Sequence, residues 1–410
     1  MTHTRHFVFS FLFFVATAAF AQSFNEDRIR GHVTFLASDQ LEGRGTASAG
    51  EIKAAEYIAR EFKSLGLKPF KGSYLRPFKY RKNTNPHDTS LAGVKEKQAN
   101  NVVGFLDNKA PYTIVIGAHY DHLGLGHDHN SLMTNPEGQI HNGADDNASG
   151  TAGVIELARY FSTNKITERY NFLFICFSGE ELGLLGSKKW CENPDIPLNK
   201  INYMINMDMI GRLNDSTKKL VIYGVGTSPA FVPLIDSLQT SFSIKKDSAG
   251  IGPSDQTSFY LKDIPVLHFF TGQHSDYHRP SDDVEKVNIK GEAEVLAYIA
   301  RLIEKTDNYP KLGFLKTRNP EQGKAAWKVT MGVMPDYTFE GPGMRIDGVT
   351  DNKPAARAGL MQGDIVIKLG KDEVKDMQTY MKALSRYSKG DTTTVEVLRA
   401  GETKVMQLTF

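Results

Sequence analysis

Five short segments of this chain contain histidine and carboxylate side chains in combinations suited to binding a metal ion. They are 119–122 (His-Tyr-Asp-His), 143–150 (Gly-Ala-Asp-Asp-Asn-Ala-Ser-Gly), 178–183 (Ser-Gly-Glu-Glu-Leu-Gly), 206–211 (Asn-Met-Asp-Met-Ile-Gly) and 276–282 (Asp-Tyr-His-Arg-Pro-Ser-Asp). Zinc in proteins is held by histidine nitrogen and carboxylate oxygen, and catalytic zinc sites leave one position open for water. If the five segments meet in space, they can form such a site.

Taken singly, each segment also has an ordinary structural explanation. His119 stands at the end of an apolar run and would equally suit a core position. Asp146, Glu180 and Glu181 precede predicted helices, where carboxylates cap the helix or complement its dipole. Asp208 differs, because a carboxylate inside an apolar strand is costly unless it is paired or bound to a metal ion.

The elements that must position these residues follow from the hydrophobic pattern. Apolar runs predict strands over 112–117, 171–177, 203–209, 219–223 and 264–270, and helical spacing predicts helices over 52–65, 151–161, 183–190, 228–239 and 292–305. This alternation predicts an α/β fold with a mixed, largely parallel sheet flanked by helices. In open α/β sheets the carboxyl ends of the strands form the ligand crevice, so the five segments should converge there.

With these motifs in this order, the chain resembles the co-catalytic dizinc aminopeptidases, secreted bacterial metallopeptidases with relatives in animals. The resemblance covers roughly residues 25–305. It implies a zinc-exopeptidase-like fold and a zinc-dependent enzyme that hydrolyses peptide bonds, with two Zn²⁺ per chain. The ligands implied are His119 and Asp208 on one zinc, Glu181 and His278 on the other, and Asp146 bridging both.

The resemblance also implies roles for two further carboxylates. Glu180 matches the general base, and Asp121 matches the carboxylate that orients His119. The chain departs from the family at Gln256, where relatives often have histidine in a segment that looks like part of the substrate pocket. This departure affects no implied zinc ligand, but it leaves the substrate contacts open.

Three alternatives to an aminopeptidase remain at this stage. Within the same fold, a single-zinc glutaminyl cyclase would differ in its metal count, and a carboxypeptidase-type relative would shorten the other end of a peptide. A catalytically inactive peptide-binding scaffold is the alternative from a different class. The complete implied ligand set, together with Glu180, argues against an inactive scaffold.

In the last 80 or so residues the pattern of predicted elements changes to short strands with two helices. This segment resembles a PDZ domain. Segments 354–360 and 363–366 match the bacterial form. Segment 339–346 looks like the carboxylate-binding loop and its following strand, which implies that Gly341, Gly343 and Met344 bind the C-terminus of a peptide or protein.

The remaining boundaries come from composition. A weakly basic start, an apolar stretch over 7–21 and small residues at Ala19 and Ala21 predict a signal peptide over 1–21, with a retained N-terminal anchor as the alternative. We therefore expect a zinc peptidase domain over 22–306, a linker over 307–328 and a PDZ domain over 329–410. The mature protein should be periplasmic or secreted, without a stable membrane span.

Charge and cysteine content narrow the range of partners. The chain has 49 Lys and Arg against 47 Asp and Glu, a formal net charge of +2, which gives no electrostatic case for a nucleic acid partner. Peptide substrates are the expected partners. The two cysteines, Cys176 and Cys191, are expected to be free thiols, with a disulfide as the alternative. The histidines of the loop that follows the first motif, His127, His129 and His141, are expected to be solvated.

Overall fold

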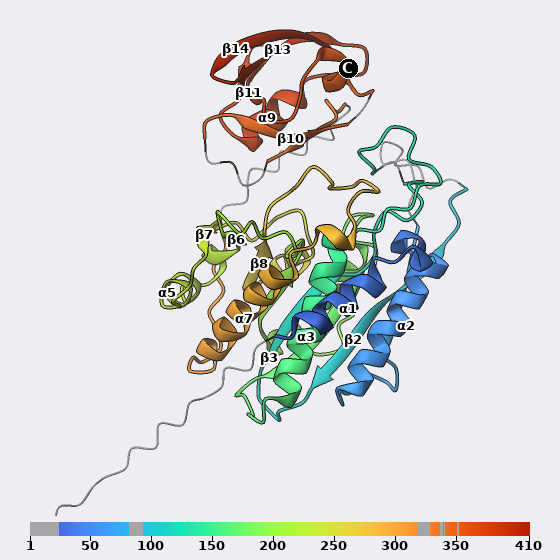
Figure 1. Cartoon of the computed structure of the whole chain (residues 1–410). Coiled ribbons are helices and arrows are strands. Elements are labelled where there is room, and N and C mark those ends of the chain that lie inside the picture. Colours follow the sequence, from blue (N-terminus) through green and yellow to red (C-terminus); the bar gives the residue numbers. More distant parts are fainter. Residues whose placement is uncertain are drawn as a thin grey trace, which may run out of the picture.

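The computed structural model describes residues 24–81, 93–128, 130–317, 329–336, 339, 341–350 and 352–410. The predicted signal peptide and the second half of the predicted linker lie outside these residues. Two units follow one another along the chain, a larger one up to residue 317 and a smaller one from residue 329 (Figure 1). Within the described residues, every helix is too short or too polar to span a lipid bilayer.

The larger unit is built on an eight-stranded sheet in the order β1-β2-β4-β3-β5-β8-β6-β7. The strands are β1 Leu75–Tyr80, β2 Lys97–Leu106, β3 Thr113–His119, β4 Asn171–Phe177, β5 Ile201–Met207, β6 Lys219–Tyr223, β7 Ser243–Lys246 and β8 Val266–Phe270. The four central strands β4, β3, β5 and β8 run parallel, whereas β1, β2 and β6 pair antiparallel with their inner neighbours. The predicted fold class, a mixed and largely parallel α/β sheet, is confirmed.

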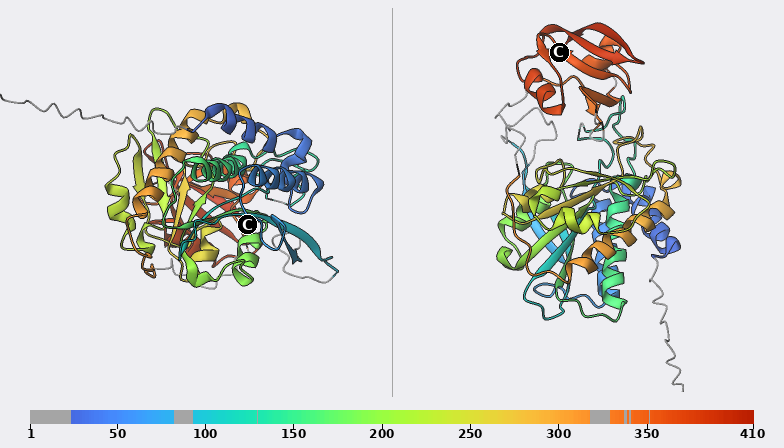
Figure 2. Two further views of the ribbon diagram at one scale, coloured as in Figure 1. Left: turned by 90° about the horizontal axis from the view of Figure 1, so that it is seen from below. Right: turned by 90° about the vertical axis from the view of Figure 1, so that its left-hand side faces the viewer.

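Helices cover both faces of this sheet (Figures 1 and 2). They are α1 Glu26–Leu36, α2 Ala49–Ser64, α3 Gly150–Thr163, α4 Leu185–Glu192, α5 Phe231–Asp236, α6 Gln256–Tyr260 and α7 Ile289–Thr306. Helices α1, α2, α3, α5 and α7 pack on one face, and α4 and α6 pack on the other. Strand β3 shows the division, because Ile114 and Ile116 join the first core while Val115 joins the second.

Burial explains why the central strands are apolar along their whole length. All residues of β3, β4 and β5 are buried, so side chains on both faces contact helices. Helix α7 begins at the N-cap Asn288, whose side chain accepts a hydrogen bond from the backbone N–H of Gly291. Its apolar stripe, which includes Val295 and Ile299, is fully buried against the sheet.

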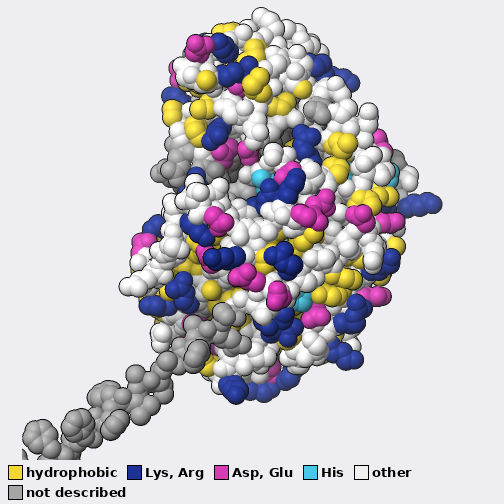
Figure 3. All heavy atoms as spheres, viewed as in Figure 1, with side chains coloured by type: hydrophobic (Ala, Val, Ile, Leu, Met, Phe, Trp, Pro, Cys, Tyr) yellow, Lys and Arg dark blue, Asp and Glu magenta, His cyan; other side chains and the backbone are white. Residues whose placement is uncertain are grey.

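The smaller unit has its own core and its own six-stranded sheet. Its elements are β9 Val333–Pro335, β10 Met344–Val349, α8 Pro354–Ala358, β11 Ile365–Leu369, β12 Asp372–Glu373, α9 Met377–Leu384, β13 Thr392–Arg399 and β14 Glu402–Thr409. The strand order is β14-β13-β11-β10-β9, with β12 paired to β11. On the face of the chain seen in Figure 3, charged side chains of both signs are interspersed.

The structure differs from the sequence prediction at several elements. Helices α1 and α6 and strands β1, β2 and β7 were not predicted. The first part of the predicted linker packs on the larger unit, because Leu312 is buried in its core and Thr317 hydrogen-bonds to Tyr260. Leu312 and Thr317 therefore belong to the larger unit. Cys176 and Cys191 are both free and buried, in two different core clusters.

Candidate metal centre

The parallel strands bring the predicted ligands to one edge of the sheet. His119 is the last residue of β3, and Asp208 directly follows β5. Glu181 lies in the turn after β4, and His278 lies in the loop after β8. Because β3 pairs with both β4 and β5, three of these strand ends are adjacent.

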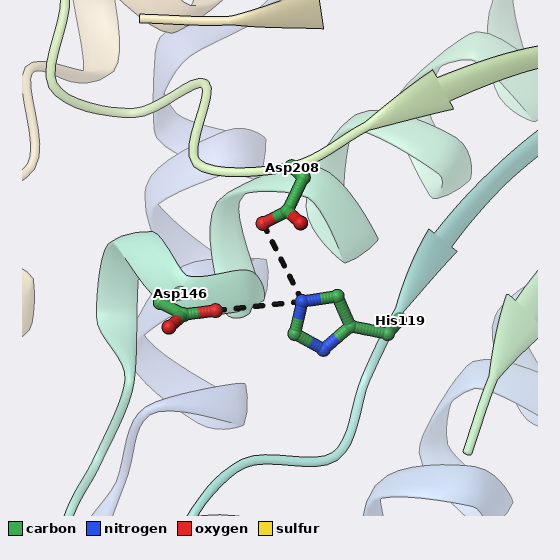
Figure 4. Close-up of side chains that lie close together, drawn as sticks. All are labelled: His119, Asp146 and Asp208. Atoms are coloured by element: carbon green, nitrogen blue, oxygen red, sulfur yellow. Dashed lines mark ion pairs between the residues drawn. The ribbon is translucent and has the colours of Figure 1, made fainter. Parts of the chain in front are cut away.

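The first group of ligand atoms is formed by His119, Asp146 and Asp208 (Figure 4). His119 Nε2 lies 3.4 Å from Asp146 Oδ1 and 3.4 Å from Asp208 Oδ1. In Figure 4 the two carboxylates point at the same ring nitrogen from two different segments. Burial opposes protonation of His119, but the charges of Asp208 and Glu180 outweigh it and raise the pKa of the imidazole well above its usual value.

The second group uses the other oxygen of Asp146. His278 Nε2 lies 3.3 Å from Asp146 Oδ2 and 3.3 Å from Glu181 Oε2. His122 also comes close, since atoms of His122, Asp146 and Glu181 lie within 4.8 Å of one another. Burial alone would raise the pKa of Asp146, but the three surrounding histidines lower it well below its usual value. The carboxylate of Asp146 is thus shared by two groups.

These distances fit two tetrahedral zinc ions. Zinc–nitrogen and zinc–oxygen bonds of about 2.0–2.1 Å in a tetrahedron place two ligand atoms about 3.3 Å apart. The four separations of 3.3–3.4 Å between the predicted ligand atoms match this spacing. In addition, Asp146 Oδ2 is buried and has no hydrogen-bond partner within the described residues. A buried carboxylate oxygen without a donor is explained by a bound cation.

Asp121 connects the first group to the two glutamates. Its carboxylate lies 3.7 Å from His119 Nδ1, and it accepts hydrogen bonds from the Thr46 hydroxyl at 2.8 Å and from the backbone N–H of Glu180 at 3.1 Å. The closest acceptor for His119 Nδ1 is the backbone oxygen of Asp121, at 3.2 Å. Asp121 therefore fixes the position of Glu180 as well as the ring of His119.

Glu180 stands beside the two groups without belonging to either. Burial raises the pKa of its carboxyl group well above the usual range, and the charges of Glu181 and Asp208 raise it further, against the lowering effect of His119. A carboxyl group whose pKa lies above the usual range for glutamate accepts a proton more readily than a free glutamate does. This is the property required of a general acid–base group.

Sequence reasoning missed three residues that the structure places around the centre. The imidazole of His122 hydrogen-bonds to Glu181, and the carboxylate of Asp282 accepts the backbone N–H of Asp146. Arg44 is fully buried and donates to backbone oxygens of both the first and the second motif. His122 and Asp282 lie inside the first and fifth motifs, so their position in the sequence could have indicated that they lie near the centre. Nothing in the sequence around Arg44 indicates its role.

The loop histidines differ from the expectation of a solvated loop. His127 is exposed, and His129 lies outside the described residues. His141 is fully buried, so the prediction is wrong for this residue. Its Nε2 lies 2.7 Å from the Ser131 hydroxyl, which also donates to the backbone oxygen of His278. His141 therefore supports the loop that carries a predicted ligand.

Gln256 is buried beside the centre. Its Oε1 accepts a hydrogen bond from Asn206 Nδ2 at 3.2 Å, and the same amide also donates to the Ser254 hydroxyl at 2.8 Å. With 1% exposure, Gln256 belongs to a polar network next to β5 and has little surface to offer a substrate.

In the smaller unit, Gly341 and Gly343 precede β10, and Met344 begins it. Strand β10 pairs with β11 on one side and with β9 on the other. A peptide that extends a sheet needs a free strand edge, so it cannot add to β10. Within the described residues β9 and β14 are the two edge strands, and β9 is the one beside β10. We therefore expect the peptide contact near Val333 of β9 rather than at Met344.

Residues 101–303 match the model of Peptidase family M28, and residues 316–409 match the PDZ domain model. Leucine aminopeptidase 2 from Trichophyton rubrum is 24% identical over 278 residues, which cover 58% of this chain and 54% of the relative. The chain thus spans about half the length of that curated relative.

Solved structures show the same fold for the larger unit. The aminopeptidase from Aneurinibacillus sp. strain AM-1 has a TM-score of 0.55 at 18% identity and covers 73% of this chain and 98% of its own. Porphyromonas gingivalis glutaminyl cyclase has a TM-score of 0.54 at 15% identity, with 69% and 99% covered. The fold is therefore shared by a protein named as an aminopeptidase and a protein named as a glutaminyl cyclase. From its sequence motifs, its fold and these matches, residues 101–303 of the larger unit form a Peptidase family M28 domain, and residues 316–409 form a PDZ domain.

Proposed function

We propose that this protein is a dizinc exopeptidase, most specifically an aminopeptidase that removes N-terminal residues from peptides. The observation that carries the proposal is the pair of ligand groups that share Asp146 through its two oxygens. His119 and Asp208 complete one site, and Glu181 and His278 complete the other. The aminopeptidase names of relatives support the choice of reaction.

The residues of this chain divide the chemical work. When bound, zinc would polarise the scissile carbonyl and lower the pKa of the attacking water. Glu180, which is held beside both ligand groups by the bond from its backbone N–H to Asp121, would take a proton from that water and deliver it to the leaving amine. Asp121 holds the backbone of Glu180 and the ring of His119 in place, so proton transfer and metal binding keep a fixed geometry.

Metal analysis tests the ligand assignment. After dialysis the wild-type protein should retain about two zinc ions per chain. His119→Ala or Asp208→Ala should weaken one site, whereas Asp146→Ala should disrupt both because it removes the shared ligand. A folded Asp146→Ala variant that keeps two zinc ions would contradict the assignment.

Product analysis tests the reaction. Zinc-loaded protein is incubated with a peptide library, and mass spectrometry identifies which end is shortened. Shortening at the N-terminus that EDTA abolishes supports the aminopeptidase. Shortening at the C-terminus would indicate a carboxypeptidase. Loss of ammonia from peptides with N-terminal glutamine, without shortening and with one zinc per chain, would indicate a glutaminyl cyclase.

The PDZ domain and the predicted signal peptide extend the proposal. We expect the PDZ domain to bind peptide or protein C-termini through an extended segment that pairs with the edge strand β9.

The apolar stretch and cleavage signal near Ala21 favour a periplasmic or secreted protein. Cell fractionation tests this location. N-terminal sequencing of the mature protein tests the cleavage site, and cleavage after Ala21 would leave Gln22 as the first residue.

A further inference from the structure

His122 is a buried histidine that the proposed ligand set leaves unused. Its side chain is fully enclosed, and its Nδ1 lies 2.8 Å from Glu181 Oε1 and 3.8 Å from Asp146 Oδ2. Its Nε2 has no hydrogen-bond partner within the described residues. Within the described residues, the one hydrogen bond of the His122 ring is therefore with Glu181, a predicted metal ligand.

The distances separate a metal ligand from a hydrogen-bond donor. Two ligand atoms on one tetrahedral zinc lie about 3.3 Å apart, and His278 Nε2 has this separation from Glu181 Oε2. His122 instead lies 2.8 Å from the other oxygen, Oε1, which is the length of a hydrogen bond to a carboxylate. Because an ionised carboxylate only accepts, the ring of His122 must carry its proton on Nδ1.

The surroundings hold the ring in this orientation. A Cβ atom on Gly143 would come within 2.5 Å of His122 Cγ and Cδ2, so the second motif needs glycine at this position for the imidazole to fit. The backbone N–H of His122 donates to the backbone oxygen of Arg44 at 3.2 Å. The guanidinium of Arg44 in turn donates to the backbone oxygens of Tyr120 and Gly143 and so ties the first motif to the second.

From this geometry we infer that His122 is a positioning residue for the second metal site. It binds Glu181 Oε1 and thereby leaves Oε2 facing His278 Nε2, where it would be available to a metal ion. The inference rests on the proposed dizinc function. Two consecutive residues would then have the same kind of role. Asp121 positions His119 of the first group, and His122 positions Glu181 of the second.

Cobalt titration of two substitutions tests the inference. Metal-free protein is titrated with Co²⁺, and the visible absorption of bound cobalt reports the affinity of each site. His122→Phe removes the donor, and we expect one of the two dissociation constants to rise about 10–100-fold while the other stays unchanged. His122→Asn places an amide N–H close to the position of Nδ1, so it should restore most of the lost affinity.

Controls separate this effect from a general loss of structure. His32→Asn alters a histidine that is also buried but bonds to Tyr57 instead of a metal ligand, and it should leave both constants unchanged. Thermal unfolding of each metal-free variant checks the fold. If His122→Phe binds both ions as wild type does, or if His122→Asn is as weak as His122→Phe, the inference is wrong while the proposed function stands. A wild-type protein that binds fewer than two ions would overturn both.

Discussion

The carboxylate of Asp282 holds the backbone that presents Asp146. Asp282 Oδ2 accepts the N–H of Asp146 at 3.1 Å and the N–H of Asp145 at 3.0 Å, and its side chain is fully buried. The backbone of Asp282 adds a third contact, because its oxygen accepts the N–H of Ala144. The loop that carries the shared ligand is thus fastened to the end of the fifth motif, next to His278.

Removing this carboxylate should therefore weaken both metal sites. Asp282→Ala leaves two buried N–H groups without an acceptor, a cost of about 1–3 kcal/mol for each group, and frees the loop of Asp146. We expect metal affinity at both sites to fall about 10–100-fold, whereas Asp282→Asn keeps an acceptor oxygen and should lose less. Competition with a chelator measures both affinities. A loss confined to one site would contradict a role exerted through Asp146.

Glu180→Gln separates proton transfer from metal binding. The amide keeps the shape of the side chain but cannot act as a base. General acid–base catalysis is typically worth about 10²–10⁴-fold, so kcat should fall by at least that range while zinc content and thermal stability change little. Steady-state kinetics on an aminoacyl substrate, with zinc analysis of the same sample, gives the answer. A folded variant with two zinc ions and kcat within about tenfold of wild type would rule out Glu180 as the base.

Ending the chain at Asn319 should remove peptide binding by the PDZ domain and keep the peptidase. Every predicted ligand precedes this point, and the packed residues Leu312 and Thr317 are retained. Among the described residues, Arg279 and Lys245 donate hydrogen bonds of 3.4 Å to backbone oxygens of the smaller unit, and these contacts are weak.

The readouts of the truncation are hydrolysis of a small aminoacyl substrate and affinity for C-terminal peptides. The first should stay within a few fold of the full chain, and the second should disappear. As a control, the isolated segment 316–410 should bind the same peptides. A folded truncated protein that no longer hydrolyses the small substrate would show that the PDZ domain contributes to the active site.

Glu156 should make stability depend on pH in acid. Burial on its own would raise the pKa of Glu156, but hydrogen bonds from His32 and Arg28 outweigh it and lower the pKa to about 2. A depressed pKa stabilises the folded state above the unfolded value of 4.5, and this stabilisation is lost as pH falls toward about 2. Glu156→Gln should flatten the stability curve between these values.

Denaturant unfolding at several pH values measures this effect. Glu61→Gln is a suitable control, because Glu61 pairs with Arg159 on the same side of the sheet but at a more exposed position. The control should change the slope less than Glu156→Gln does. Equal slopes for wild type and Glu156→Gln between pH 2 and 4.5 would show that this carboxylate does not contribute.

Much of the fold could be read from local patterns. The strands β3, β4, β5, β6 and β8 were predicted to within two residues at every end, because buried strands carry continuous apolar runs. Strands β1, β2 and β7 lie at or near the sheet edges and are more exposed, so their hydrophobic signal is weak. Helix α1 is a short amphipathic helix close to the predicted cleavage site, and it was not predicted.

The sequence could predict which histidine and carboxylate side chains come together at the strand ends, and their role as ligands stays a prediction. It could not predict what holds these side chains in place. The sequence alone determined the residue types at the strand ends, and parallel strands place their carboxyl ends together whatever their exact packing. It also determined the α/β architecture and the change to short strands at the start of the PDZ domain.

Only the tertiary structure decided the contacts that depend on register and loop path. The bond from His122 to Glu181 joins residues 59 apart, and the bond from Asp146 to Asp282 joins residues 136 apart. Hydrogen bonds require positions correct to a few tenths of an ångström, and no periodicity in a sequence carries that information. The strand order of the PDZ domain is a second example, because the free edge at β9 depends on which strands pair and not on the composition of either one.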